Sequence, residues 1–210
     1  ASMSVALGNA RLFDETQRPL KQSEQRAAEL AIVNSVQAAL ASKLDVQAIH
    51  KLVGDKLRDV FDAQAVLIGL FDHEKQVEVF TYNFEKGQHF DAPPRALNQT
   101  RRRLIETRQT VFNNRITPET ITRTGAQAIG DSQMPKSVIF VPMVVGDEVK
   151  GYVSIQNVDR FDAFTEADVR LLETLAASMT VALENARLFD ETQRLLKETE
   201  ARNTELAVIN

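Results

Sequence analysis

The 210-residue sequence contains no cysteine, no tryptophan and only three histidines. The absence of cysteine excludes disulfides, thiolate zinc sites, cysteine nucleophiles and thioether-linked chromophores within this chain, and it fits a reducing compartment. No run approaches the ~20 apolar residues that a membrane-spanning helix needs, and the first residues do not form a signal peptide pattern. We therefore expect a cytoplasmic protein without a membrane partner.

The sequence also has little excess of either charge. It carries 25 basic and 29 acidic residues, a formal net charge of −4. Such a chain has no overall field that would attract nucleic acid, and the clustered aromatic side chains or wide basic stripe of a nucleic-acid reader are missing. We expect no nucleic-acid partner. Hydrophobic residues make up 43% of the chain, which is enough for a sizeable globular core.

The two ends of the chain carry nearly the same sequence. Residues 1–34 and 177–210 differ at only 10 of 34 positions, so one piece stands on both sides of an intervening domain. Self-similarity of this kind indicates a repeated architecture. We therefore expect the chain to be one period of a tandem array, beginning inside the closing helix of one unit and ending where the next begins, with neither terminus natural.

A long helix is predicted at the C-terminal end. No proline or glycine follows Thr165, and Thr165 with Asp168 has the pattern of an N-cap and capping box. A helix from there to about Asn210 would be roughly 69 Å long, so its second half should project from the domain. Its apolar stripe predicts a parallel homodimer through the terminal helices, with an interface at Met179, Ala182, Ala186, Phe189 and Leu196. The alternative for the first part of the stripe is packing against its own domain.

The N-terminal copy is interrupted by Pro19, which should kink or restart the helix near Arg18. A helix is then predicted from Leu20 to about Ser42. Asp45 is expected to cap a second helix, whose apolar stripe is formed by Val46, Ile49, Val53, Leu57 and Val60.

Short strands follow these helices. Residues 65–71 and 77–84 predict one hairpin, and residues 137–145 and 149–157 predict another, joined by a tight turn at Gly146–Glu148. Between the hairpins we expect a loop at 85–99, a short helix near 99–108, a strand at 111–114 and an irregular stretch to Lys136. This pattern indicates an α+β fold with an antiparallel sheet.

Both faces of this sheet must be covered, because the run Val138–Val145 is apolar without alternation. Helices are expected to cover one face. The other face can be covered only by the long loops at 84–99 and 113–136, and such an arrangement favours a small-molecule cavity.

The stretch MPKSVIFVPMVVGDEVKGYVSIQN resembles the signature of the GAF domain, a serine followed by aliphatic residues ending in V-P, a glycine turn and G-x-[LIV]-x-[LIV]. The matching residues are Ser137, Ile139, Val141, Pro142, Gly146, Gly151, Val153 and Ile155. The resemblance extends back to KLDVQAIHKLV and forward to RFDAFTEADVRLLETLAASMTVALENARLF.

The resemblance implies an antiparallel sheet of five or six strands with helices on one face and a ligand pocket on the other. It gives the expected organisation: linker helices at 1–42, a GAF domain at 43–189 and a linker helix at 190–210. Strings of such domains resemble the sensory part of bacterial histidine kinases and nucleotide cyclases.

The ligand is left open by the sequence. Cyclic-nucleotide-binding members carry an N-K…F-x-x-x-D-E pattern, which this chain matches only in part, at Asn157, Phe164 and Asp168. A purely structural role at the helix start accounts for Phe164 and Asp168 equally well. The residues that we predict to contact a ligand are Tyr82, Phe84, His89, Phe90, Arg101, Asn113, Arg123, Asp131, Ser132 and Ser137.

The three consecutive arginines at 101–103 point in different directions on a helix, so one at most should face inward. His50 and His73 are predicted to lie on the surface. His89 is the one histidine placed to ligate haem or a metal, and one histidine does not make a metal site. Family members that bind bilins or reduce methionine sulfoxide usually need cysteine, so we identify no cofactor.

No nucleophile–base pair or phosphate-binding loop is present, so we expect no catalytic activity. Two hypotheses follow. The chain is a sensory module that binds a small molecule, or it is a ligand-free dimerisation and relay module. Polar residues facing an open cavity would favour the first, and filling of the cavity by Phe84, Phe90 and Met134 would favour the second.

Overall fold

The computed structural model describes residues 23–24, 26–41, 45–61, 63–129 and 132–209, with side chains up to Arg202. The chain divides into two compact units, Ala1–Ser35 and Val36–Asn210. The described residues of the first unit are helical, and helix continues to residue 41 in the second. The predicted kink at Arg18 and Pro19 lies outside the described residues.

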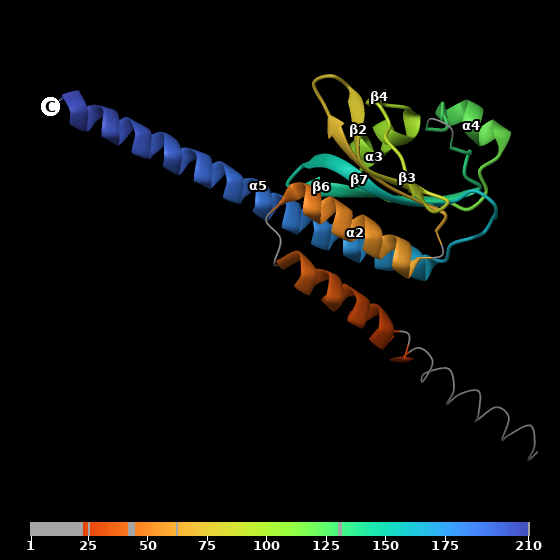
Figure 1. Ribbon diagram of the computed structural model, residues 1–210. Coiled ribbons are helices and arrows are strands. Elements are labelled where there is room, and N and C mark those ends of the chain that lie inside the picture. The colour runs from red at the N-terminus through yellow and green to blue at the C-terminus, as the bar shows by residue number, and fades with distance from the viewer. Residues whose placement is uncertain (1–22, 25, 42–44, 62, 130–131, 210) are drawn as a thin grey trace, which may run out of the picture. The chain divides into compact units, whose positions relative to one another are not determined.

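A seven-stranded antiparallel sheet forms the centre of the second unit (Figure 1). Its spatial order is β3-β2-β1-β7-β6-β5, and β4 also pairs with β2. The strands are β1 (Ala65–Asp72), β2 (Val77–Glu85), β3 (Gln88–His89), β4 (Arg95–Ala96), β5 (Val111–Asn113), β6 (Ser137–Val145) and β7 (Glu148–Asn157). Both predicted hairpins are confirmed. The prediction of a plain loop at 85–99 was wrong, because β3 and β4 pair with the edge of β2.

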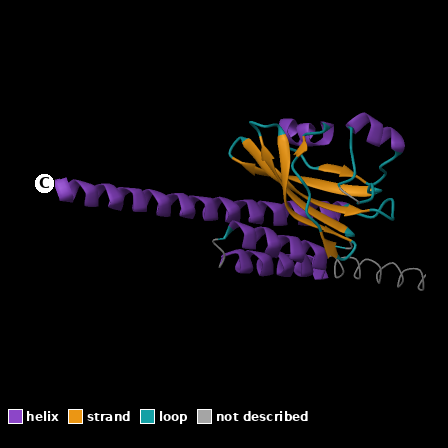
Figure 2. Ribbon diagram, turned by 45° about the horizontal axis from the view of Figure 1, so that its top comes forward, coloured by secondary structure: helices purple, strands orange, loops and turns teal. Residues whose placement is uncertain are grey.

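Two helices cover one face of the sheet, α2 (Val46–Val60) and α5 (Glu166–Ile209) (Figures 1 and 2). The Asp45 carboxylate accepts hydrogen bonds from the backbone N–H groups of Gln47 and Ala48, as the predicted N-cap should. At the start of α5, the Asp168 carboxylate accepts from the Thr165 N–H at 2.7 Å, and the Thr165 hydroxyl accepts from the Asp168 N–H at 3.3 Å. This reciprocal pair is the predicted capping box.

The opposite face is covered by α3 (Gln99–Thr107) and α4 (Pro118–Thr124) together with the segments around them (Figure 2). Only irregular chain was predicted from the sequence where α4 lies. The helix forms because Thr117 caps it, Pro118 occupies its first turn and Gly125 ends it in the left-handed conformation. An apolar cluster packs on this face between the sheet and α3, and it includes Leu67, Leu104, Phe140 and Tyr152.

A β-bulge at Thr81 changes the face to which β2 directs its side chains. Ile68 of β1 pairs with Tyr82 and the next residue, Gly69, pairs with Phe80, so Thr81 is an extra residue. Before the bulge, Glu78 and Phe80 share the face of α3. After it, Tyr82 and Phe84 lie on the face of α2, since the Tyr82 hydroxyl donates to Asp55 and the Arg58 guanidinium lies over the Phe84 ring.

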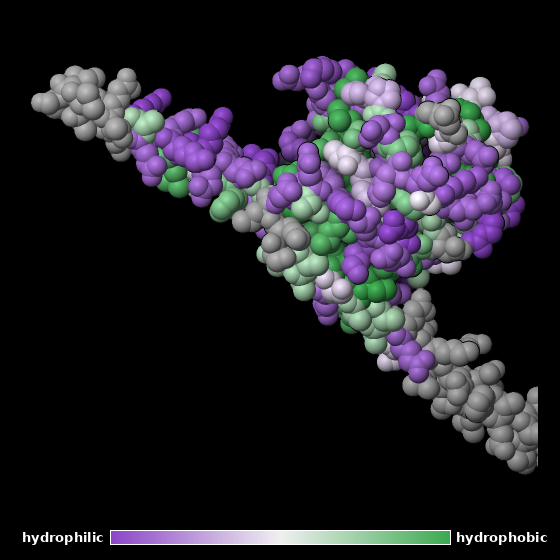
Figure 3. Space-filling model, viewed as in Figure 1, coloured by the Kyte–Doolittle hydropathy of each residue, from purple (hydrophilic) through white to green (hydrophobic). Residues whose placement is uncertain are grey.

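Helix α5 is 44 residues long, which corresponds to about 66 Å. Leu172, Leu175, Met179 and Ala186 are buried in the chain itself. Met179 and Ala186 are therefore not free to form the predicted dimer interface. From Arg187 to Arg202 the described side chains are exposed, Phe189 to 43% and Leu196 to 52%. This part of α5 is mostly hydrophilic, with small hydrophobic areas between the polar side chains (Figure 3).

The apolar stripe of α5 is buried as far as Ala186, further toward the C-terminus than the sequence suggested. The reason is that α5 packs against the helical segment 36–41 as well as against α2. Gln37, on the helical segment 36–41, donates a hydrogen bond to the Ser178 hydroxyl at 3.2 Å. Val36 and Leu40 of the same segment are buried. Within the described residues, no helix is long and apolar enough to cross a bilayer.

Candidate functional site

A cavity of about 770 Å³ lies between the sheet and the cover formed by α3, α4 and the segments that flank them. Leu67 of β1, Val138 and Phe140 of β6 and Gln156 of β7 contribute to the sheet side of its lining. The covering elements contribute Asn98, Arg101 and Arg103 from the α3 region, and Arg123, Gln127 and Met134 from the region of α4 and beyond. The cavity therefore combines an apolar surface with several basic and amide groups.

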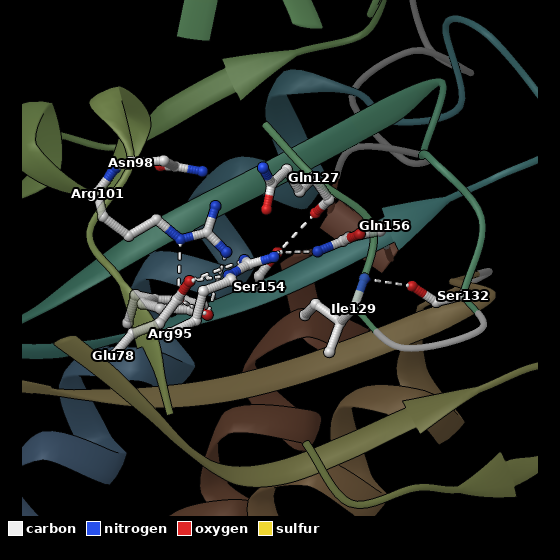
Figure 4. A network of polar contacts seen from close by, with 10 residues as sticks. Glu78, Arg95, Asn98, Arg101, Gln127, Ile129, Ser132, Ser154 and Gln156 are labelled. Carbon is white, nitrogen blue, oxygen red and sulfur yellow. Dashed lines mark hydrogen bonds and ion pairs between the residues drawn. The ribbon is translucent and has the colours of Figure 1, made fainter. Parts of the chain in front are cut away.

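A buried polar cluster, the Glu78 cluster, lies beside this cavity and is formed by Glu78, Arg95, Arg101 and Tyr152. The Glu78 carboxylate is fully buried. Arg95 approaches one of its oxygens to 2.7 Å, Arg101 donates from Nε to the other at 2.9 Å, and the Tyr152 hydroxyl donates to that same oxygen at 2.7 Å. Figure 4 shows both guanidinium groups meeting at the one carboxylate. One negative charge is thus shared between two positive charges.

Burial alone would raise the pKa of Glu78, but the charges of Arg101 and Arg95 and the hydrogen bond from Tyr152 outweigh it and hold the pKa below its usual value. Burial raises the pKa of the Tyr152 hydroxyl, and the neighbouring Glu78 raises it further. At neutral pH the cluster therefore contains a carboxylate, two guanidinium ions and a neutral phenol.

Arg101 reaches the cluster because of its place on α3. Asn98 caps this helix by accepting from the Arg101 N–H at 3.1 Å, and the helix turns Arg101 inward while Arg102 and Arg103 stay exposed. The prediction that at most one of the three arginines faces inward is confirmed. The guanidinium carbon lies 4.4 Å from the centre of the Phe140 ring and 4.9 Å from that of Tyr152, so both rings make cation–π contacts with it.

Further polar groups lie around the cavity (Figure 4). Arg95 also donates to the backbone carbonyl of Gln127, which ties β4 to the segment after α4. Gln156 donates to the buried Ser154 hydroxyl at 3.2 Å. The Ser132 hydroxyl accepts from the Ile129 N–H at 2.8 Å and thereby shapes the covering segment.

The structure brings half of the predicted ligand-contacting residues together at the cavity. Phe90, Arg101, Asn113, Arg123 and Ser132 all contribute to the lining. Asp131 lies outside the described residues. Phe90 and Met134, which were expected to fill the space in a ligand-free module, stand in the cavity wall and leave about 770 Å³ open.

Tyr82, Phe84, His89 and Ser137 are not part of this lining, which corrects the prediction. The bulge at Thr81 sends Tyr82 and Phe84 to the helix-covered face. His89 packs edge-on against both rings and lines a smaller hollow of about 350 Å³ at the sheet edge. The Ser137 hydroxyl donates to the backbone carbonyls of Asn114 or Arg160 and accepts from the Ala163 N–H.

The residues that match part of the cyclic-nucleotide pattern have structural roles here. The Asn157 side chain accepts from the N–H groups of Asp159 and Arg160 and holds the turn after β7. Phe164 is buried, and Asp168 closes the capping box of α5. None of these three residues lines the cavity.

The prediction that His50 lies on the surface was wrong, because only 3% of it is exposed. His50 lies beside the apolar stripe of α2 and becomes buried when α2 packs against α5 and the sheet. Burial lowers the pKa of His50, although a hydrogen bond to the Val46 carbonyl opposes this. His73 is partly exposed, and its Nε2 lies 2.8 Å from the Val149 carbonyl oxygen.

Glu78, Arg95 and Tyr152 were not predicted from the sequence. The signal for Tyr152 was present in β7, where Tyr152, Ser154 and Gln156 place polar groups at every second position and alternate with Val153 and Ile155. In the part of the chain that the structure describes, no three His, Asp or Glu side chains gather as a metal site.

The sequence profile of the GAF domain matches residues 43–184, and the chain belongs to this family. GAF domains are sensory or regulatory modules, and most are not catalytic. No curated protein matches the chain.

Solved structures with the same fold come from several kinds of protein. The GAF domain of an Acinetobacter phosphoenolpyruvate-protein phosphotransferase has 16% identity and a TM-score of 0.59, covering 77% of this chain and 95% of its own. A methyl-accepting chemotaxis protein has 17% identity and a TM-score of 0.60, with coverage of 73% and 98%. The free methionine-R-sulfoxide reductase of Neisseria meningitidis, solved with its substrate, has 18% identity and a TM-score of 0.60, with coverage of 78% and 93%. At these identities the likeness concerns the fold alone.

Proposed function

We propose that this chain is a non-catalytic sensory GAF module that binds a small molecule in the cavity and passes the signal through paired α5 helices to an output domain outside this chain. An output domain of the histidine kinase or nucleotide cyclase type would suit such a module. The observation that carries the proposal is the cavity itself, whose volume of about 770 Å³ lies in the range of small-molecule sites.

The wall of the cavity supports ligand binding over a purely structural role. A space kept only by packing would be closed by apolar side chains, since empty volume costs dispersion contacts. Here Asn98, Asn113, Arg123 and Gln127 line the space together with Phe90 and Phe140. Convergent polar groups on an apolar wall are what an oriented small molecule requires.

The relay step rests on the connection between the cavity and α5. Helix α5 packs under β6, and β6 contributes Val138 and Phe140 to the cavity from its other face. A ligand that moves β6 therefore acts on α5 directly. The exposed Phe189 and Leu196 offer a partner helix an apolar surface, and the near-identity of residues 1–34 and 177–210 fits a tandem array in which one helix serves two domains.

The alternative is a ligand-free dimerisation and relay module, which the exposed apolar residues of α5 would equally serve. Native mass spectrometry separates the two. Protein purified from cells, or incubated with a library of neutral and charged metabolites, should retain a small molecule. The Val138→Phe variant, which fills part of the cavity, should not retain it. If neither purified nor incubated wild-type protein retains any compound, the relay module is the better account.

A further inference from the structure

The Glu78 cluster carries one more positive than negative charge. Two guanidinium ions, Arg95 and Arg101, contact the single carboxylate of Glu78. Glu78 is fully buried, Arg101 is 5% exposed, and the Arg95 side chain is 21% exposed. An uncompensated charge with this little access to water is costly, so a further anion at this place would be stabilised.

Arg101 also keeps a donor for such an anion. Its Nε donates to Glu78 and its Nη2 donates to Tyr152, whereas no described residue accepts a hydrogen bond from Nη1. Arg101 contributes to the cavity lining, and its position is fixed by the hydrogen bonds to Glu78 and Tyr152 and by contacts with the Phe140 and Tyr152 rings. A fixed guanidinium loses little entropy when it binds, and it pairs strongly with an oxyanion.

The remaining charged residues of the cavity lining also favour binding of an anion. Among the described lining residues, three more arginines, Arg102, Arg103 and Arg123, stand against two acidic residues, Glu85 and Glu106. Glu85 is engaged by the Gln133 N–H. The surroundings of the Glu78 cluster therefore add positive potential.

The apolar part of the lining limits the kind of anion. Leu67, Val138, Phe140 and Ile129 line the same cavity, Phe140 in contact with Arg101, and they suit a hydrocarbon or aromatic body. The excess at the buried cluster itself is one charge, which the acid group of a monoanion balances.

Resting on the proposed function, we infer that the ligand is an organic monoanion, with its acid group paired to Arg101 beside the Glu78 cluster and its apolar body against β6. A carboxylate is the simplest such group, and a phosphodiester has the same charge. Glu78 competes with the ligand for the two arginines and does not itself contact the ligand.

Matched acid and amide probes test this inference. Benzoate, octanoate and indole-3-acetate are titrated in parallel with benzamide, octanamide and indole-3-acetamide, and cyclic AMP and cyclic GMP represent phosphodiesters. The readout is the NMR signal of the Arg101 Nε–H, assigned through Arg101→Lys. We expect at least one acid to move this signal and to bind about tenfold or more tightly than its amide, the effect of one charge-assisted hydrogen bond.

Two variants should change the affinity for the acid in opposite directions, so a loss of folding in one variant cannot account for both results. Arg101→Lys keeps the charge but loses the planar fork, so the acid should bind about tenfold more weakly. Glu78→Gln removes the internal competing anion, so the acid should bind more tightly; a merely structural Glu78 would leave the affinity unchanged or reduce it. Arg170→Ala removes one exposed positive charge on α5 and should leave binding unchanged.

The outcomes separate this inference from the proposed function. If an amide binds as tightly as its acid, the cavity binds a small molecule but the inference of an anion is wrong. A cyclic nucleotide as the sole binder would support the monoanion and identify a phosphodiester as its source. If no acid or cyclic nucleotide binds while the metabolite library yields a neutral ligand, the inference fails and the proposed function stands. If the library yields nothing either, both fail.

Discussion

Glu78 is the residue on which the candidate site depends most. It is fully buried near the start of β2, and it is tolerated there because Arg95, Arg101 and Tyr152 satisfy its carboxylate. These partners come from β4, α3 and β7, so this one side chain joins the sheet to the elements that cover the cavity.

The pH dependence of stability should reveal this role. Because the folded-state pKa of Glu78 is lowered from its usual 4.5, its ionised form contributes stability above about pH 4.5, and this contribution is lost as the pH falls through the folded-state value. Glu78→Gln should therefore lose about 3 kcal/mol at neutral pH and less in acid. Chemical denaturation across pH, with the exposed Glu106→Gln as control, measures this. A constant difference between wild type and Glu78→Gln at every pH would contradict it.

His50 should give a second, separate pH effect. Burial lowers the pKa of His50 in the folded protein. Below about pH 6.5 the unfolded chain therefore takes up a proton that the folded protein does not, and the free energy of unfolding decreases as the pH is lowered. His50→Leu removes the titrating group and should flatten this slope by up to about 1.4 kcal/mol per pH unit. Denaturation of both proteins on either side of pH 6.5 tests it, and parallel pH curves for the two would show that His50 is not buried in its neutral form.

At the scale of elements, the contact between α2 and β2 fixes the helix layer. A Cβ atom added at Gly54 of α2 would overlap the Tyr82 ring, which the bulge at Thr81 turns toward the helix. Gly54→Ala should therefore destabilise the protein by about 1–3 kcal/mol, although alanine favours a helix by about 1 kcal/mol. The exposed Asp59→Ala on the same helix should change stability by less than about 0.5 kcal/mol. Thermal or chemical denaturation decides, and a stabilised Gly54→Ala would refute the packing of Tyr82 on α2.

Prediction from the sequence succeeded for features that depend on neighbouring residues and failed for those that depend on how strands pair. Local signals were sufficient for the caps at Asp45 and Thr165 and for both hairpins, because each depends on neighbouring residues. Unbroken alternation in β2 would place Glu78, Phe80, Tyr82 and Phe84 on one face, whereas the bulge puts Tyr82 and Phe84 on the other. A bulge arises from how two strands fit together, so the sequence of β2 alone does not show it. Arg95 was missed because β4 exists only by pairing with β2.

At the scale of the whole molecule, the proposed dimer makes a sharp prediction. Phe189→Glu with Leu196→Glu places charges on the exposed apolar stripe of α5 and should convert a dimer into a monomer, because buried unpaired carboxylates are costly. Arg194→Glu with Ala201→Glu has the same seven-residue spacing, lies on another side of the helix and should stay dimeric. Light scattering on the wild type and both double variants at tens of micromolar protein measures their molar mass and so distinguishes monomer from dimer. A monomeric wild type, or a dimer that tolerates both charges on the stripe, would exclude this surface as the interface.

Binding of a small molecule in the cavity between the sheet and its cover is the property on which the proposed function depends. Protein-observed NMR against a metabolite library tests it most directly, since the amide signals of Ala128 and Ser132 report on the cavity wall. The account predicts that at least one compound shifts these signals in the wild type and fails to shift them in Val138→Phe. It is contradicted if no compound shifts them, or if the shifts persist when the cavity is filled.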